Sequence, residues 1–334
     1  MIGNATRALA VSALAMLAAT SAVAQQFTFK MSSPVINDST HEYMKAMKAG
    51  IEERSKGRIK VEVYPANQLG QIPATVDGVA LGTIEMTQPA IGFFIGIEPR
   101  FQTLETAGLF DSMQHGNKVL ADPEIRKRLA TFGEAKGVEP LYTILHGELL
   151  LITTKPLNTV ADLKGMKLRV AGAAPMHTEP FKRLGASPLA MPLGEVLPAL
   201  QNKAIDGATL TYPVIMAFKY FDVSKMVTQV PSGFVVVSGL VNRRFMKSLG
   251  PELESIVREE SRKAESRFNE WAFAEHDRVR GAWEKAGGKT VKFAAADAQR
   301  FQAEVNASLT AVVDKNPAMK ADYEAFVAAA KKYR

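Results

Sequence analysis

The clearest alternation of apolar and polar residues lies in the middle of the chain, at residues 167–171. Leu168 and Val170 occupy one face of this segment and its other residues occupy the opposite face, which predicts a half-buried strand. A glycine-containing turn follows at 172–175. Because proline suits the first position of a helix, Pro175 predicts a helix over residues 176–184.

The rest of the chain alternates between segments of strand period and segments of helix period. Further strands are expected at 27–31, 59–63, 85–89, 140–145, 149–154, 208–211, 234–241 and 290–293, with a break between two of them at 146–148. Further helices are expected from about 39 to 56 and at 73–82, 122–136, 192–201, 251–285, 296–314 and 320–333. The alternation predicts an α/β protein in which parallel strands are joined by right-handed crossovers.

Arg169 is the first candidate for ligand binding. It lies near the carboxyl end of its strand and beside the amino end of the next helix. The guanidinium presents paired donors, and the helix adds free N–H groups and the positive end of its dipole. In open α/β sheets such strand ends line the ligand crevice. The pattern therefore predicts an anion site, the alternative being an arginine on a strand face with no ligand role.

A second strand end contributes two more candidates. Gln88 lies at the exit of strand 85–89 and is a candidate hydrogen-bonding residue, unless it is an exposed loop glutamine. Phe93 belongs to the apolar cluster at 93–95, which is typical of a core, although one of its rings is placed to line a pocket.

Several ordered motifs resemble the DctP-type substrate-binding proteins of TRAP transporters. They are DLKGMKLRV, F-K-x-L-G-A-x-P, M-P-L-x-E-V-x-x-A-L-Q and I-D-G within residues 162–207, and GRIKVEVYPANQLG and LGTIEM within residues 57–86. The resemblance implies a two-lobed periplasmic-binding-protein fold. Each lobe would hold a mixed, mostly parallel sheet flanked by helices, and the helix at 251–285 would span both. It places lobe I at residues 25–146 plus about 235–274, and lobe II at 147–234 plus about 275–334.

The resemblance also implies a function and a role for Arg169. The protein would be the solute receptor of an ion-gradient-driven TRAP transporter, and its lobes would close over a small organic acid and deliver it to membrane permease subunits. Arg169 would bind the carboxylate. Many related proteins carry a second arginine close to Glu148, where this chain has a glutamate followed by Leu149. Glu148 therefore either meets a polar or cationic ligand group or is solvated or salt-bridged.

Other positions that resemble the family's ligand contacts are also changed. In related proteins, the end of this strand often carries an asparagine that touches the ligand. The corresponding position in this chain falls near Leu210, so the resemblance implies an apolar rim with hydroxyl groups, made by Thr209, Leu210 and Tyr212. Phe234 faces the same place by analogy with the family. Burying an apolar group contributes about 25 cal/mol per Å², so these walls favour a hydrophobic or aromatic acid. A sugar acid, or an aliphatic hydroxy or keto acid, is the alternative ligand.

The first 24 residues have the pattern of a cleaved signal peptide. A basic start is followed by an apolar run at 8–19 and by Ala22-Val23-Ala24, with small residues at both positions that a signal peptidase requires. A membrane anchor is the alternative, but the run is short and rich in alanine. The expected location is the periplasm.

Composition excludes several other classes of protein. The 334 residues include no cysteine, which excludes disulfides and thiol chemistry. The net charge of +7 comes from scattered residues, so no nucleic-acid partner is expected. The chain has no catalytic motif, and its five histidines show no metal-ligand spacing. We expect the protein to be a monomer and to hold neither a cofactor nor a metal.

Three other functions are less favoured alternatives. They are a receptor for an ATP-driven importer, a receptor that signals through a sensor kinase, and an extracytoplasmic enzyme on the same fold.

Overall fold

The structure, a computed structural model, describes residues 25–334, so the predicted signal peptide lies outside the described residues. Nine strands form one hydrogen-bonded network within this range. They are β1 (Phe27–Ser32), β2 (Ile59–Tyr64), β3 (Met86–Thr87), β4 (Val138–Thr153), β5 (Lys167–Val170), β6 (Ser187–Ala190), β7 (Gly207–Leu210), β8 (Met226–Asn242) and β9 (Lys289–Lys292). Their order is β2-β1-β3-β8-β4-β7-β5-β6, with β9 paired to β8.

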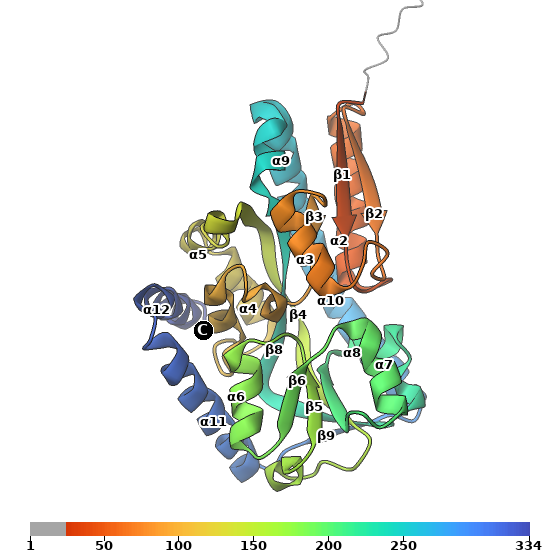
Figure 1. Ribbon diagram of the computed structural model, residues 1–334, viewed down its shortest axis with the longest axis vertical. Helices are drawn as coiled ribbons and strands as arrows, with labels where there is room; N and C mark the ends of the chain where they lie inside the picture. The colour runs from red at the N-terminus through yellow and green to blue at the C-terminus, as the bar shows by residue number, and fades with distance from the viewer. Residues whose placement is uncertain (1–24) are drawn as a thin grey trace, which may run out of the picture.

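Helices cover this sheet network on its outer faces (Figure 1). The α-helices are α2 (Ser39–Arg54), α3 (Ile72–Leu81), α4 (Met113–Ala121), α5 (Pro123–Leu129), α6 (Pro175–Arg183), α7 (Leu193–Gln201), α8 (Tyr212–Ala217), α9 (Arg243–Ser248), α10 (Gly250–Lys285), α11 (Ala295–Val313) and α12 (Pro317–Lys332). Short 3-10 helices are η1 (Ile91–Phe94), η2 (Pro99–Glu105), η3 (Glu134–Lys136), η4 (Val160–Leu163) and η5 (Tyr220–Asp222).

The two ends of the network belong to two lobes. In the upper lobe of Figure 1, β1 pairs in parallel with β2 and with β3, beside α2 and α3. In the lower lobe, β5 pairs in parallel with β6 and with β7, beside α6 and α7. This is the two-lobed α/β fold expected from the sequence, and the boundaries given above for each lobe remain predictions.

The strands β4 and β8 join the lobes. They pair with each other in antiparallel fashion, while β8 also pairs with β3 at Leu240–Val241 and β4 with β7 at residues 150–153. The prediction of two strands separated at residues 146–148 is wrong. The ladder shifts register between Leu145 and Gly147 and again between Glu148 and Leu150. Such bulges absorb extra residues without ending a strand.

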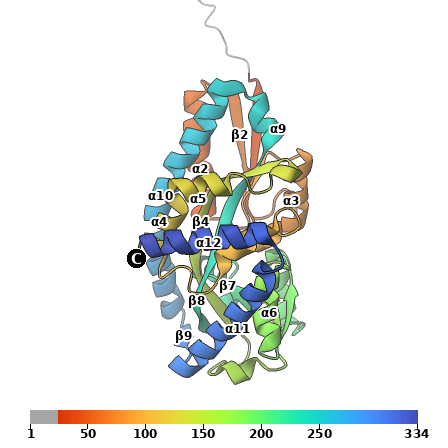
Figure 2. The same ribbon diagram turned by 90° about the vertical axis from the view of Figure 1, so that its left-hand side faces the viewer.

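The helix α10 spans both lobes, as the sequence predicted for residues 251–285. It packs against α2 in the upper lobe and α8 in the lower one, and Figure 2 shows it running along one side of the molecule. Its apolar stripe includes the buried residues Leu253, Val257 and Phe268. The Tyr43 hydroxyl of α2 lies 2.6 Å from the Ser261 hydroxyl of α10, which fixes the two helices in register.

The single charged helix predicted at 122–136 is wrong. The structure has α5, capped by the Asp122 carboxylate, and then η3. Gly133 and Gly137 adopt left-handed backbone angles (φ 80° and 70°) on either side of η3, and these interrupt the helix. The sequence analysis also missed α4, whose Ser112 side chain caps its amino end.

The carboxyl-terminal helices divide between the lobes. The helix α11 packs against α6, whereas α12 packs against η2, α4 and α5, as Figure 2 shows for the horizontal α12. These contacts favour placing α12 with lobe I rather than lobe II. Within residues 25–334, no helix combines the length and the apolarity needed to cross a bilayer.

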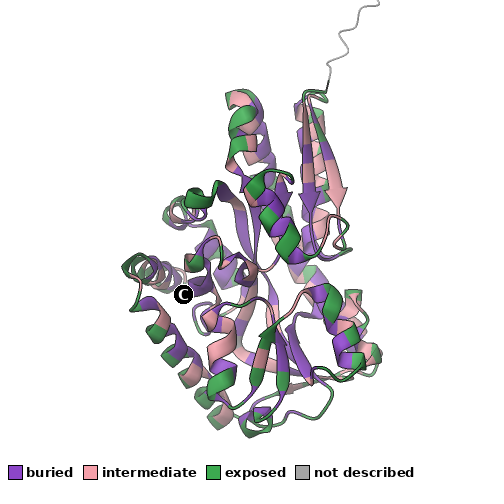
Figure 3. Ribbon diagram, viewed as in Figure 1, coloured by how far each residue is buried: buried purple, intermediate pink, exposed green. Residues whose placement is uncertain are grey.

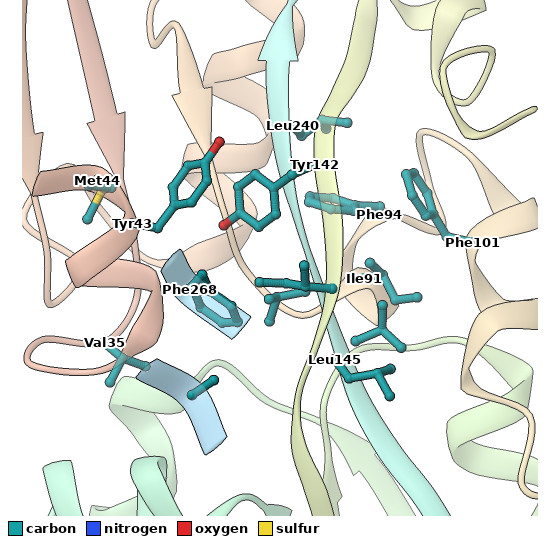
Figure 4. Close-up of a cluster of buried hydrophobic side chains, with 14 of the residues drawn as sticks. Val35, Tyr43, Met44, Ile91, Phe94, Phe101, Tyr142, Leu145, Leu240 and Phe268 are labelled. Carbon is teal, nitrogen blue, oxygen red and sulfur yellow. The ribbon is translucent and has the colours of Figure 1, made fainter. Parts of the chain in front are cut away.

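The core follows the joining strands through both lobes. Buried positions concentrate along β4 and β8 and on the inner faces of the helices (Figure 3). In the cluster of Figure 4, the Tyr43 and Tyr142 rings are 4.1 Å apart between centroids, and the Phe94 and Phe101 rings are 5.4 Å apart. The joining segments are therefore packed on both sides and do not form a loose tether.

Phe268→Ala is expected to lower the free energy of unfolding by about 3–5 kcal/mol, because it removes a ring that is only 2% exposed from the α10 core face. Arg267→Ala, at the exposed neighbouring position, should change it by less than about 0.5 kcal/mol. Urea unfolding of both variants checks this. Equal losses would show that α10 does not depend on its buried face.

Candidate functional site

A cavity lies between the two lobes and draws its walls from both. It encloses about 490 Å³, including its opening to solvent, which is in the usual range for a small-ligand pocket. Val35, Ile72 and Phe93 contribute apolar surface from the upper lobe, and Leu210 and Val214 do so from the lower lobe. We refer to it as the Arg169 cavity because that residue is the only lysine or arginine that lines it.

Arg169 is held rigidly at the wall of this cavity. The side chain is 1% exposed. Its Nε donates to the Met191 carbonyl oxygen at 2.8 Å, and its Nη1 donates to the Thr209 carbonyl oxygen at 2.9 Å. These acceptors follow β6 and lie in β7, the neighbours of β5 in the sheet. The sequence therefore places the arginine on β5, and the folded sheet orients it.

The third nitrogen of Arg169 is unsatisfied. Nη2 is buried and has no hydrogen-bond partner in the described chain. Burial lowers the pKa of Arg169 to about 10, and no carboxylate offsets the effect. A buried donor without an acceptor costs roughly 1–3 kcal/mol, and an unpaired buried charge costs more. An anionic oxygen bound in the cavity would satisfy both requirements.

A buried acid–base pair lines the same cavity. The Asp38 Oδ2 lies 3.0 Å from the His146 Nε2, and the His146 Nδ1 lies 3.3 Å from the Thr211 hydroxyl. Burial raises the pKa of Asp38, but the hydrogen bonds from His146, Thr40 and the His41 N–H outweigh it, so the net pKa is lowered. The pair fixes the orientation of the imidazole and presents a hydrogen-bonding group to the cavity.

Sequence reasoning missed the position of this pair at the cavity. Asp38 also caps α2, because its Oδ1 accepts from the His41 N–H. His146 looked like one of several scattered histidines. The bulge in β4 is what brings it beside Asp38, which is 108 residues away in sequence, and no local pattern contains that information.

Five of the predicted site residues line the Arg169 cavity. They are Arg169, Gln88, Phe93, Thr209 and Leu210. Gln88 has another role as well, because its Nε2 donates to the Thr40 carbonyl oxygen at 3.1 Å and its Oε1 accepts from the Tyr142 hydroxyl. Both ends of the amide are thus engaged, and it is not an exposed loop residue.

The other four predicted site residues lie elsewhere. Leu149 and Phe234 line a second cavity. Glu148 and Tyr212 line neither cavity: the Glu148 carboxylate accepts from the Gln229 amide at 2.7 Å, and the Tyr212 hydroxyl lies 2.6 Å from that of Thr290. For these two, the structure places the side chains in hydrogen bonds within lobe II and not at the ligand cavity.

The lobes meet beside the cavity at two glycines and one polar pair. A Cβ atom built at Gly92 would lie 2.2 Å from the Ala171 carbonyl oxygen, and one at Gly172 would lie 2.2 Å from the Gly92 carbonyl oxygen. The Glu105 carboxylate of η2 accepts a hydrogen bond from the His177 imidazole of α6. Only residues without side chains permit this approach.

A sequence model described as bacterial extracellular solute-binding protein, family 7 (DctP), matches residues 33–316. The chain belongs to the DctP family. A curated relative, the 2,3-diketo-L-gulonate-binding periplasmic protein of Escherichia coli K12, is 30% identical over 253 residues, which is 75% of this chain and 76% of the relative. The C4-dicarboxylate-binding periplasmic protein of Rhodobacter capsulatus is 26% identical and covers 83% of each chain.

Solved structures show the same fold. A TRAP periplasmic solute-binding protein from Xanthobacter autotrophicus with bound β-D-galacturonate superimposes with a TM-score of 0.84 at 24% identity, covering 90% of this chain and 99% of that one. One from Desulfovibrio salexigens with bound orotic acid gives 0.80 at 23% identity, covering 90% and 99%. The two-lobed fold of this DctP-family protein is therefore confirmed.

The Glu105–His177 pair makes the stability of the DctP-family protein depend on pH. Burial lowers the pKa of His177, but the charge and hydrogen bond of Glu105 outweigh it, so the net pKa is raised. A raised pKa means that the stabilisation is complete below about pH 6.5 and is lost as the pH rises through the folded-state value.

His177→Gln should therefore lower the free energy of unfolding more at pH 6 than at pH 9, as measured by urea unfolding. His41→Gln is the control, because burial and Lys45 lower the pKa of His41 and its stabilisation has the opposite pH dependence. A His177→Gln loss that was the same at both pH values would contradict the role assigned to the pair.

Proposed function

We propose that this protein is the periplasmic receptor of a TRAP transporter and binds a small organic acid in the Arg169 cavity. The observation that carries the proposal is the buried guanidinium of Arg169, whose Nη2 lacks a partner at a cavity between the lobes. A ligand carboxylate would accept from Nη2 and neutralise the buried charge. Family membership supports the receptor role.

The ligands named for related proteins agree with an anionic group. The relatives are named for binding 2,3-diketo-L-gulonate and C4-dicarboxylates, and the similar structures hold galacturonate, orotic acid and succinate. Each of these ligands is an acid. The shared element, a carboxylate, is what Arg169 is placed to bind.

The remaining walls favour a hydrophobic or aromatic acid. Apolar side chains such as Val35, Ile72, Phe93, Leu210 and Val214 make up most of the cavity surface. Ligand hydroxyl groups against these walls would lose hydrogen bonds to water without replacement, at roughly 1–3 kcal/mol each. The apolar part of an aryl or alkyl acid gains free energy at the same walls.

A hydroxy acid or sugar acid is the second candidate, and one observation favours it. The imidazole of His146 and the hydroxyl of Thr211 line the cavity with Asp38. Because Asp38 occupies the Nε2 side of His146, the Nδ1 side can exchange its long 3.3 Å contact with Thr211 for a ligand hydroxyl. This polar corner accommodates one hydroxyl more easily than the several of a sugar acid.

The transport cycle needs the lobes to close on the ligand and to present the closed form to the membrane permease. In this structure the two glycines and the Glu105–His177 pair already bring the lobes into contact, and we propose that closure on the ligand uses the same contact. Release from the signal peptide would place the receptor in the periplasm, where it would act as a monomer. No step requires catalysis, and no group of three histidine or acidic residues among the described ones could hold a metal.

Arg169→Ala is expected to weaken binding of the acid about 10–100-fold, because a hydrogen bond to a charged group contributes about 1.5–3 kcal/mol. Arg169→Lys should also weaken it, because an ammonium cannot reproduce the planar guanidinium. Calorimetry with acids found by a thermal-shift screen measures both. Arg300→Ala, at an exposed site on α11, is the matched control. Unchanged affinity in Arg169→Ala would end the proposal.

Gly92→Val is expected to weaken binding at least tenfold, because its side chain would collide with Ala171 and with the His177 ring and would keep the lobes apart. Gly96→Val is the matched control, since nothing lies within 4 Å of a Cβ at that position. Calorimetry, with small-angle scattering for the closed fraction, tests this. If both variants bind normally, ligand binding does not need this contact.

A further inference from the structure

A second cavity adjoins the Arg169 cavity, lined mainly by the lower lobe and bordered by Glu105 and Ala107 of the upper lobe. It encloses about 550 Å³, including its opening. Most of its surface comes from aliphatic and aromatic side chains of β4, α6, β8 and α11, including Leu149, Phe181, Val230, Phe234 and Val305. We call it the apolar cavity. Nothing in the receptor function requires a second cavity of this size.

We infer that the apolar cavity holds the hydrophobic tail of the acid whose carboxylate Arg169 binds. This inference rests on the proposed function and extends it to the ligand's length and polarity. The ligand it specifies is a monocarboxylic acid in which a chain of several methylenes carries an aryl or alkyl end.

The two cavities are separated by a wall that is one residue thick. Ala171, Thr209 and Val235 line both of them. Thr209 is central to this wall, because its carbonyl oxygen accepts from Nη1 of Arg169 while the residue also borders the apolar cavity. A carboxylate placed on the free Nη2 therefore lies close to the apolar cavity, and a flexible chain leading from it has to pass between the residues that the two cavities share.

The charges of the two cavities set the ligand's direction. None of the residues that line the apolar cavity is a lysine or an arginine. Its one acidic residue, Glu105, accepts from His177 and from the Val236 N–H at 3.4 Å. A second carboxylate would be buried there next to Glu105 with no cation of its own, which is costly. The carboxylate therefore belongs at Arg169 and the apolar end in the second cavity.

Two residues that the sequence associated with the ligand support this assignment. Leu149 and Phe234 do not line the Arg169 cavity, yet both line the apolar one. The leucine at 149 carries no charge, so it offers no counter-ion to the second carboxylate of a dicarboxylate. It supplies apolar surface to a tail instead.

The test is calorimetry of the mature protein with straight-chain phenyl-substituted acids, from phenylacetate to 5-phenylpentanoate. Affinity is expected to rise about fourfold per methylene, the factor that corresponds to the burial of one such group. A dicarboxylate should bind at least tenfold more weakly than the monocarboxylate of equal length, for example suberate compared with octanoate. The inference would be overturned if affinity did not rise with chain length, or if the dicarboxylate bound more tightly than the monocarboxylate.

Variants that fill the apolar cavity locate the tail. Val305→Phe on α11 should abolish the gain from the longer acids and leave phenylacetate binding within about twofold of wild type. Val312→Phe, on the same helix but lining neither cavity, is the matched control. This variant should keep the rise in affinity from phenylacetate to 5-phenylpentanoate. Val230→Phe fills the cavity from β8. It replaces Val305→Phe in the test if thermal unfolding shows that Val305→Phe is not folded.

The possible failures are distinguishable. If phenylacetate binds through Arg169 but Val305→Phe and Val230→Phe keep the full gain in chain length, the tail lies elsewhere and this inference is wrong while the receptor function stands. If no carboxylate of any length binds the wild-type protein, the proposed function fails and the inference fails with it.

Discussion

The uncompensated charge of Arg169 is the constraint on which the rest of the site depends. Sheet neighbours hold two of its nitrogens through backbone carbonyl oxygens, and the third nitrogen is buried without a partner. Carbonyl groups orient a guanidinium but do not neutralise it, so burial alone lowers the pKa of Arg169 to about 10. A fold that retains such a charge at an interlobe cavity loses stability unless something else supplies the counter-ion.

The surrounding architecture makes that charge available to a ligand only when both lobes are present. Arg169, Thr209 and Leu210 come from the lower lobe, whereas Val35 and Phe93 come from the upper one. The strands β4 and β8 run through both lobes and are packed on both sides, and α10 contacts both. Motion between the lobes is therefore restricted to bending at these shared elements, as in hinged receptors.

The cavities also separate chemical tasks. The Arg169 cavity holds the cation and the one polar corner, made by Asp38 and His146. The apolar cavity has no lysine or arginine, and the two ionisable residues that line it, Glu105 and His177, are paired with each other. In the proposed complex this asymmetry would orient the acid, because the free energy of burying a charge exceeds that of any single apolar contact. The glycines at 92 and 172 allow the walls to come together around it.

The sequence by itself predicted most of the elements and the family, and it singled out Arg169 as the candidate anion-binding residue. Strand and helix periods located β1, β2, β5, α6 and α10 to within a residue or two, because those patterns depend on local burial. It could not predict the uninterrupted β4, since bulges depend on the partner strand, nor the break between α5 and η3, where Gly133 adopts a left-handed backbone angle. It named Tyr212 as a ligand candidate and left Glu148 between ligand contact and solvent, and in the structure both side chains form hydrogen bonds away from the Arg169 cavity. Only the tertiary structure brought His146 to Asp38 and divided Leu149 and Phe234 from Arg169, because those relations join residues far apart in the chain and depend on how the strands pair and the lobes meet.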